Sequence, residues 1–226
     1  MRLKTIISSL VVLGSLSAQA LQFDQDVPEK IQKQMLEDLA FTYQIQGSKQ
    51  TPYHQKIFSG LSGDKYKTFF ESRIKSVGVD SCGGGAAVAC VQPFFASDKM
   101  WLTENFIKFS HPQVARTMVV YHESRHTEKI NLFWSHNNCP TPFVDENGKE
   151  MKSIWTGAPL AGEPACDSTA FGSYGSSTIM LKNISKYCEN CFEKVKMDAD
   201  LYATDQLGRI HKADVKKAML DDFSSN

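Results

Sequence analysis

The sequence has no excess of charge of either sign. Its 25 basic and 25 acidic side chains balance to a formal net charge of zero. A nucleic-acid-binding protein needs a basic excess to neutralise phosphates, so we expect no nucleic-acid partner. Repeats, low-complexity tracts and obvious linkers are also missing. With 42% hydrophobic and 22% charged residues, the composition is that of a folded globular domain, neither disordered nor collagen-like.

Long apolar runs are scarce, and the first twenty residues hold the main one. Arg2 and Lys4 precede an apolar stretch over residues 6–16, and a small-x-small pattern ends at Ala20. This order is typical of a secretory signal peptide, and the run is too short to span a bilayer. We therefore predict a cleaved signal over residues 1–20 and one domain over residues 21–226. We expect export to the periplasm or the medium, and no transmembrane segment in the mature chain.

Six cysteines form an even set, which in an oxidising compartment favours disulfide bonds over free thiols. Six cysteines allow 15 pairings, and sequence alone does not choose among them. For Cys188 and Cys191 the alternatives to a structural disulfide are a redox CxxC site or half of a zinc site, but no thioredoxin-like context surrounds these residues. Closeness along the chain favours three bonds: Cys82–Cys90, Cys188–Cys191 and, from the remaining two, Cys139–Cys166.

Apolar periodicity divides the domain into helices and a few strands. A capping-box pattern, Ser110 followed by Gln113, marks the start of one long helix. We expect a mostly helical α+β single domain with a small sheet, stapled by disulfides. The expected helices cover about 28–43, 53–77, 111–132, 164–187 and 192–223, the last with a break near Gly208. The expected strands cover 86–94 and 100–109, and residues 133–162 are expected to be irregular.

The stretch from His122 to His126 reads His-Glu-Ser-Arg-His and lies in an expected helix. Residues four apart share one helix face, so both imidazoles can bind one metal ion. Glu123 would then lie close enough to take a proton from a metal-bound water. This HExxH arrangement resembles that of the zinc metallopeptidases called zincins, which implies a bound Zn²⁺ and hydrolysis of peptide bonds in a peptide or protein substrate.

Zinc at a catalytic site needs a third protein ligand. Residues 163–167 resemble the ExxxD pattern that gluzincins carry on a second helix, which implies Glu163 as that ligand and Asp167 as the partner of a ligand histidine. Pro164 would place Glu163 at the helix entrance, so Asp167 is an alternative ligand, as in aspartate-zincins. His136 is a further candidate, although it does not match the metzincin spacing.

The resemblance to zincins covers roughly residues 86–180 and assigns further roles. Glu123 would act as general base, Tyr174 is a weak candidate for stabilising the transition state, and residues 100–109 match the edge strand that binds extended substrate. The alternative is a non-catalytic zinc-binding protein or a disulfide-stabilised interaction protein of the cell envelope. Substrate preference and oligomeric state cannot be read from the sequence.

Overall fold

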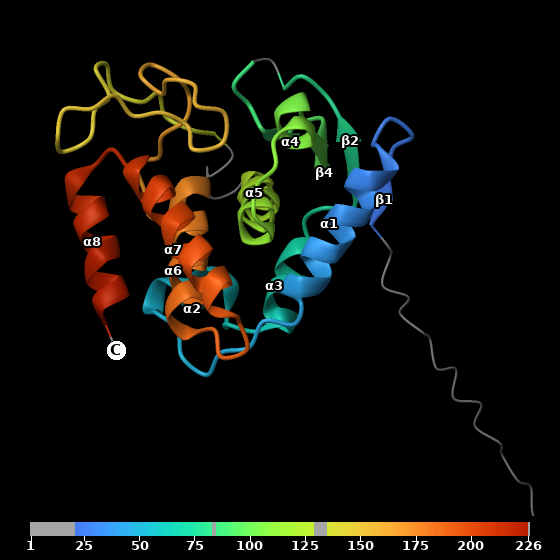
Figure 1. Ribbon diagram of the computed structural model, residues 1–226, viewed down its shortest axis with the longest axis horizontal. Coiled ribbons are helices and arrows are strands. Elements are labelled where there is room, and N and C mark those ends of the chain that lie inside the picture. The colour runs from blue at the N-terminus through green and yellow to red at the C-terminus, as the bar shows by residue number, and fades with distance from the viewer. Residues whose placement is uncertain (1–20, 83–84, 129–134, 226) are drawn as a thin grey trace, which may run out of the picture.

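One buried helix, α5 (Gln113–His126), lies at the centre of the molecule and is seen end-on in Figure 1. Twelve of its fourteen residues are buried, which distinguishes it from an amphipathic surface helix. The computed structural model describes residues 21–82, 85–128 and 135–225. These residues form a single α+β domain with eight helices and one four-stranded sheet, as the sequence predicts in outline.

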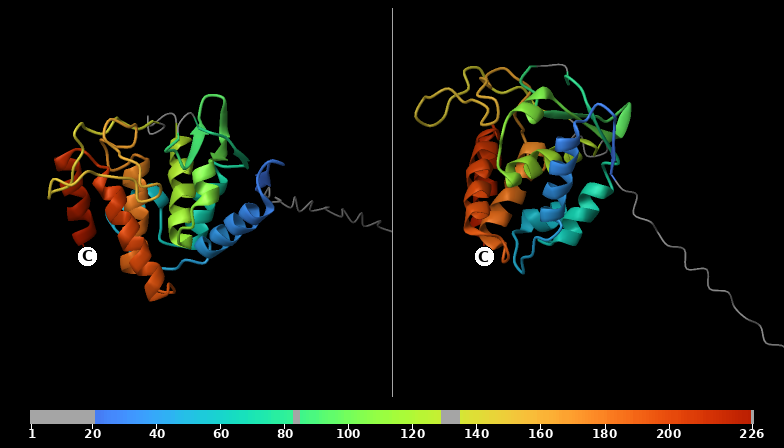
Figure 2. Two further views of the ribbon diagram at one scale, coloured as in Figure 1. Left: turned by 45° about the horizontal axis from the view of Figure 1, so that its top comes forward. Right: turned by 45° about the vertical axis from the view of Figure 1, so that its right-hand side comes forward.

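Helices surround α5 on two sides, as the two turned views in Figure 2 also show. On one side α6 and α7 pack against each other and against α5, and α1 and α3 cover the other side. The remaining helices are α1 (Glu29–Thr42), α2 (Pro52–Phe58), α3 (Gly63–Glu71), α4 (Glu104–Lys108), α6 (Ser173–Tyr187), α7 (Glu193–Gly208) and α8 (Ala213–Ser224).

The sheet has the strand order β1-β2-β4-β3. Its strands are β1 (Gln22–Phe23), β2 (Ser76–Val79), β3 (Ala89–Gln92) and β4 (Ala96–Leu102). The first three in this order run parallel, and β3 pairs antiparallel with β4 at one edge. Because β3 also packs against α5, this edge of the sheet lies beside the helix that carries the two histidines.

The strand expected over residues 100–109 is only partly correct. Strand β4 ends at Leu102, and α4 begins two residues later. The side-chain oxygen of Thr103 accepts a hydrogen bond from the backbone N–H of Asn105, so Thr103 caps this helix. Strand β4 is also an inner strand, and the edge beside α5 is formed by β3.

Two helix boundaries also differ from the prediction. Helix α5 begins at Gln113 after Pro112, with no side-chain cap from Ser110, and it ends at His126. The expected helix over residues 164–187 begins only at Ser173. Before it, residues 163–167 are tied by backbone hydrogen bonds to other segments. For example, the Cys139 N–H donates to the Glu163 carbonyl, and the Asp167 N–H donates to the Arg209 carbonyl.

All three disulfide bonds expected from the sequence are present, with no free cysteine among the described residues. Across the described ranges, no helix is long and apolar enough to cross a membrane. The expected signal peptide at residues 1–20 lies outside the described residues. The 133–162 excursion contains no helix where it is described and folds over one end of the helical layer, as the yellow and orange loops in Figure 1 show.

Candidate metal centre

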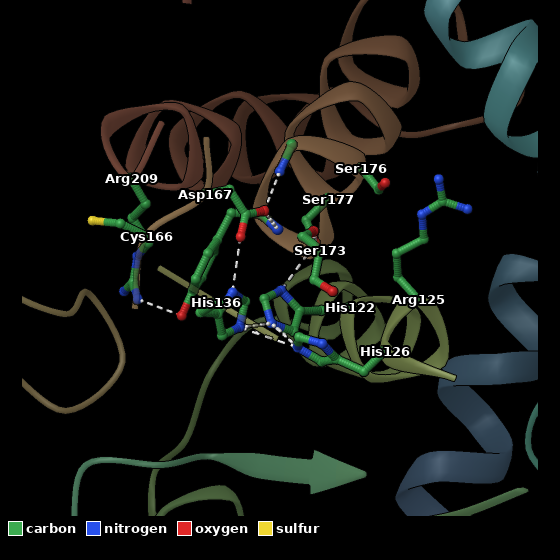
Figure 3. Close-up of polar contacts among 12 residues, drawn as sticks. His122, Arg125, His126, His136, Cys166, Asp167, Ser173, Ser176, Ser177 and Arg209 are labelled. Carbon is green, nitrogen blue, oxygen red and sulfur yellow. Dashed lines mark hydrogen bonds and ion pairs between the residues drawn. The ribbon is translucent and has the colours of Figure 1, made fainter. Parts of the chain in front are cut away.

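Three imidazoles converge on one point between α5 and the loop that follows it (Figure 3). The Nε2 atoms of His122 and His126 are 3.2 Å apart, and each lies 3.1 Å from Nε2 of His136. Four-residue spacing on α5 aligns the first two rings, and the loop supplies the third. Tetrahedral zinc with Zn–N bonds of about 2.0–2.1 Å needs ligand nitrogens about 3.3–3.4 Å apart, which is close to these distances.

The hydrogen bonds on the far side of the rings leave nitrogen lone pairs directed at the common point. His136 Nδ1 lies 2.9 Å from the Asp167 carboxylate, which only accepts, so this nitrogen carries the proton. His122 Nδ1 faces the Ser177 hydroxyl at 3.4 Å, and that hydroxyl donates to the Ser173 carbonyl. In the neutral rings both Nε2 atoms are therefore acceptors, and acceptors 3.1 Å apart attract a cation rather than each other.

The environment favours neutral, metal-binding imidazoles. His122 and His126 are buried, and burial lowers the pKa of His122 well below its usual value, with His126 and His136 adding to the effect. A neutral imidazole is the form that binds metal. The chemistry of this donor set therefore fits a transition-metal ion such as zinc, and the three histidines together could hold one.

Glu123 lines the same cavity as the three histidines and is itself buried. Burial raises the pKa of its carboxyl to about 8. A divalent cation in the cavity would act in the opposite direction and favour the carboxylate. A carboxyl group whose pKa lies close to neutral pH can both accept and return a proton, which is what general acid–base catalysis requires.

The cavity beside the imidazoles has a volume of about 620 Å³ and is large enough for a short segment of substrate. The edge strand β3 and the preceding residues 85–88 form one wall. Apolar side chains of α5 and of the 133–162 excursion form another, namely Met118, Val119, Ile154, Trp155 and Leu160. Tyr174, Gln206 and Arg209 also line this cavity.

Glu163, expected as the third ligand, is exposed at the rim of this cavity and is not part of the ligand cluster. The expectation required a helix that begins near Pro164 and presents Glu163 and Asp167 on one face. That helix begins at Ser173 instead, and Asp167 contacts His136 as its hydrogen-bond partner. The ligand cluster is therefore completed by His136, which the sequence allowed only as a further candidate.

A signal for His136 was present in the cysteine pattern. His136 precedes Cys139 by three residues, and Asp167 follows Cys166 directly. The disulfide between these cysteines and the paired backbone hydrogen bonds between Asn137 and Cys166 bring the imidazole and the carboxylate together. The expected bond thus already implied that His136 and Asp167 are neighbours.

Tyr174 lies against two of the imidazoles. Its ring stacks on His136 with centroids 4.4 Å apart, and it meets His122 edge-on at 4.5 Å. Its hydroxyl accepts a hydrogen bond from Nη1 of Arg209 at 2.9 Å. A role for Tyr174 in stabilising a transition state stays a prediction. Arg125 points away from the imidazoles in Figure 3 and pairs with Glu128.

Comparison with known proteins adds no relative. No family model, no curated protein and no solved structure matches this chain. Inferences about function therefore depend on the geometry of the cavity and its ligand cluster.

Proposed function

We propose that this protein is an exported zinc-dependent hydrolase of peptide bonds with a zincin-like site. The observation that carries the proposal is the convergence of His122, His126 and His136, with Glu123 in the same cavity. Three histidine ligands that leave one coordination position open are the arrangement of a catalytic rather than a structural zinc site. Three disulfides are consistent with an oxidising compartment, which supports export.

Zinc bound there would lower the pKa of a coordinated water toward about 7 and polarise a carbonyl oxygen. Glu123 accepts the proton of the attacking water on its buried carboxylate and returns it to the leaving amine nitrogen. The three histidines would hold the metal through their Nε2 atoms. Asp167 fixes the tautomer and orientation of His136 through the bond to Nδ1.

The free edge of β3 supports a peptide as the substrate. This strand pairs with β4 on one side, and its other side has no strand partner among the described residues. Residues 85–91 line the cavity beside the imidazoles. An extended peptide can therefore add to this edge by backbone hydrogen bonds. The apolar wall formed by Met118, Trp155 and Leu160 favours substrates with an apolar side chain near the scissile bond.

The first test combines metal analysis with a blocked, degenerate peptide library read by mass spectrometry. We expect about one zinc per purified chain and cleavage of the library by the wild type. Glu123→Gln should keep the zinc and lower the cleavage rate by about 10²–10⁴-fold, because the proton acceptor is lost. Glu146→Gln, an exposed loop substitution, is the matched control and should behave like the wild type.

Three results would contradict the proposal in different ways. A chain that binds zinc but cleaves no peptide would be a non-catalytic zinc protein, and equal activity of the wild type and Glu123→Gln would remove the proposed base. Fewer than roughly 0.2 zinc ions per chain, with no zinc uptake after dialysis against the metal, would rule out the tetrahedral site.

A further inference from the structure

A buried arginine lines the cavity. Arg209 follows α7 directly, is only 6% exposed, and lines the same cavity as Glu123 and His136. Figure 3 shows Arg209 to the left of the three imidazoles. Arginine is rarely buried to this degree without paired acceptors, so its hydrogen bonds need to be accounted for.

The guanidinium group has more donors than partners. It carries five N–H donors, and among the described residues the Tyr174 hydroxyl accepts one of them. Asp205 forms an ion pair with Nε at 3.4 Å, a separation that is long for a hydrogen bond, and Nε has no hydrogen-bond partner among the described residues. Cζ of Arg209 also lies 4.7 Å from the centroid of the Tyr174 ring. This contact fixes the position of the guanidinium group without using its remaining donors.

Gln206 supplies an unused acceptor in the same wall. It is 3% exposed and lines the cavity, and its Nε2 donates to Asp205 Oδ2 at 2.8 Å. This bond uses the amide nitrogen and leaves Oε1 as the remaining acceptor. Oε1 is buried and has no hydrogen-bond partner among the described residues. Leaving a buried acceptor without a hydrogen bond is unfavourable, and this favours a ligand that donates to it. The same oxygen of Asp205, Oδ2, therefore contacts both Gln206 and Arg209.

We propose that Arg209 and Gln206 form a subsite that binds a carboxylate of the substrate together with a neighbouring N–H group. The guanidinium donates to the carboxylate, and Gln206 Oε1 accepts from the N–H. Both groups occur side by side at the free C-terminus of a peptide, and an acidic side chain offers the carboxylate alone. The proposal deepens the proposed peptidase function and rests on it for the identity of the ligand.

A second role for Arg209 must be separated from this one. Because Nη1 binds the Tyr174 hydroxyl, Arg209 could serve only to hold Tyr174 against His136. Such a positioning role would affect zinc affinity and every substrate equally. A carboxylate subsite would discriminate between ligands that differ only in that carboxylate, and this difference decides the experiment.

The test measures binding to the zinc-loaded Glu123→Gln protein by isothermal titration, so that turnover does not interfere. The probes are three N-acetylated tetrapeptides: one with a free C-terminus, the same peptide as its C-terminal amide, and the amide with an internal Gln replaced by Glu. Each is measured with Arg209 intact, with Arg209→Met, and with Lys194→Met. Lys194 is an exposed side chain of α7, so its replacement is the matched removal of one positive charge.

With Arg209 intact we expect the free acid or the Glu peptide to bind at least about tenfold more tightly than the neutral amide. Tighter binding of the free acid would assign the carboxylate to the C-terminus of the peptide. Tighter binding of the Glu peptide would assign it to a side chain. Arg209→Met should abolish the difference, and Lys194→Met should preserve it. Equal binding of all three peptides, no binding of any, or an equal loss for all three in Arg209→Met would overturn the subsite. Discrimination without hydrolysis by the wild type would overturn the peptidase function and leave the subsite.

Discussion

Asp167 connects the loop that carries His136 to the start of α6. One carboxylate oxygen accepts from His136 Nδ1, and the other accepts from the backbone N–H of Tyr174 at 2.7 Å at the start of α6. The residue is buried, so neither bond competes with water. A single side chain therefore orients a ligand ring and also fixes the first turn of the helix that packs against α5.

We predict that Asp167→Asn weakens zinc binding by about 10–100-fold, because a neutral amide orients the imidazole less strongly and reduces its basicity. Competition with a fluorescent chelator measures the affinity. Asp200→Asn, on the exposed side of α7, is the control and should leave it unchanged. Unaltered affinity in Asp167→Asn would show that the contact with His136 does not tune the metal site.

His54 is another buried imidazole, remote in sequence from the candidate metal ligands. Its ring nitrogens face Gln50 and the Tyr66 hydroxyl, and burial lowers its pKa to about 3. In the unfolded chain the same group titrates near 6.5. Below that pH the unfolded state binds a proton that the folded state rejects, so stability falls as the pH drops from about 6.5 toward 3.

The wild type should therefore lose about 1 kcal/mol more unfolding free energy between pH 7.5 and pH 5.5 than the variant His54→Gln. Urea denaturation of both proteins in chelator at the two pH values measures this difference. Comparing the two proteins removes the contribution of the other titrating groups. An identical pH dependence would mean that His54 takes up its proton in the folded state.

At the scale of elements, the 133–162 excursion depends on the disulfide that closes it. The Cys139–Cys166 bond joins residues 27 apart, and paired backbone hydrogen bonds link Asn137 with Cys166. The bond lies between the segment that carries His136 and the residue before Asp167. The segment that carries His136 is thereby held against the residues that follow the excursion, where Asp167 accepts the hydrogen bond of His136.

Replacing both Cys139 and Cys166 by alanine should lower the free energy of unfolding by about 3–4 kcal/mol and also weaken zinc binding. The control is the double alanine variant of Cys188 and Cys191. That bond closes a loop of only three residues' separation, so its loss should cost less and leave zinc affinity unchanged. Chemical denaturation and chelator competition measure the two effects. Equal zinc affinity in both double variants would separate the disulfide from the metal site.

On the scale of the whole molecule, the ligand cluster joins the central helix to the excursion. Two ligands lie on α5, which packs between α6 and α1, and the third lies on the loop. A metal ion bound only by the folded chain stabilises it in proportion to its concentration over Kd. Metal binding should therefore raise the free energy of unfolding of the whole domain as well as order the site itself.

Zinc at 100 times Kd should raise the free energy of unfolding by about 2.7 kcal/mol, or Tm by about 5–10 °C for a domain of this size. His136→Ala should abolish most of the shift and Glu163→Gln should keep it, because Glu163 is outside the ligand cluster. Scanning calorimetry with and without zinc measures both. A shift that survives His136→Ala and is lost in Glu163→Gln would reverse the assignment of the third ligand.

The sequence by itself determined the features that depend on local spacing. Four-residue spacing on a helix was enough to place His122 and His126 together, and chain proximity favoured the three cysteine pairs that the structure contains. Apolar periodicity also located most helices, including the two that end the chain.

Only the tertiary structure decided the third ligand, the edge strand and the start of α6. Each depends on contacts between segments far apart in the chain. The 163–167 segment forms its backbone hydrogen bonds with residues 137–139 and with Arg209, so it cannot form a helix that presents Glu163. Likewise β3 becomes the edge because β2 takes the other side of β4. Local helix and strand propensities do not depend on these long-range contacts and so cannot predict them. The same long-range contacts bring His136 to α5.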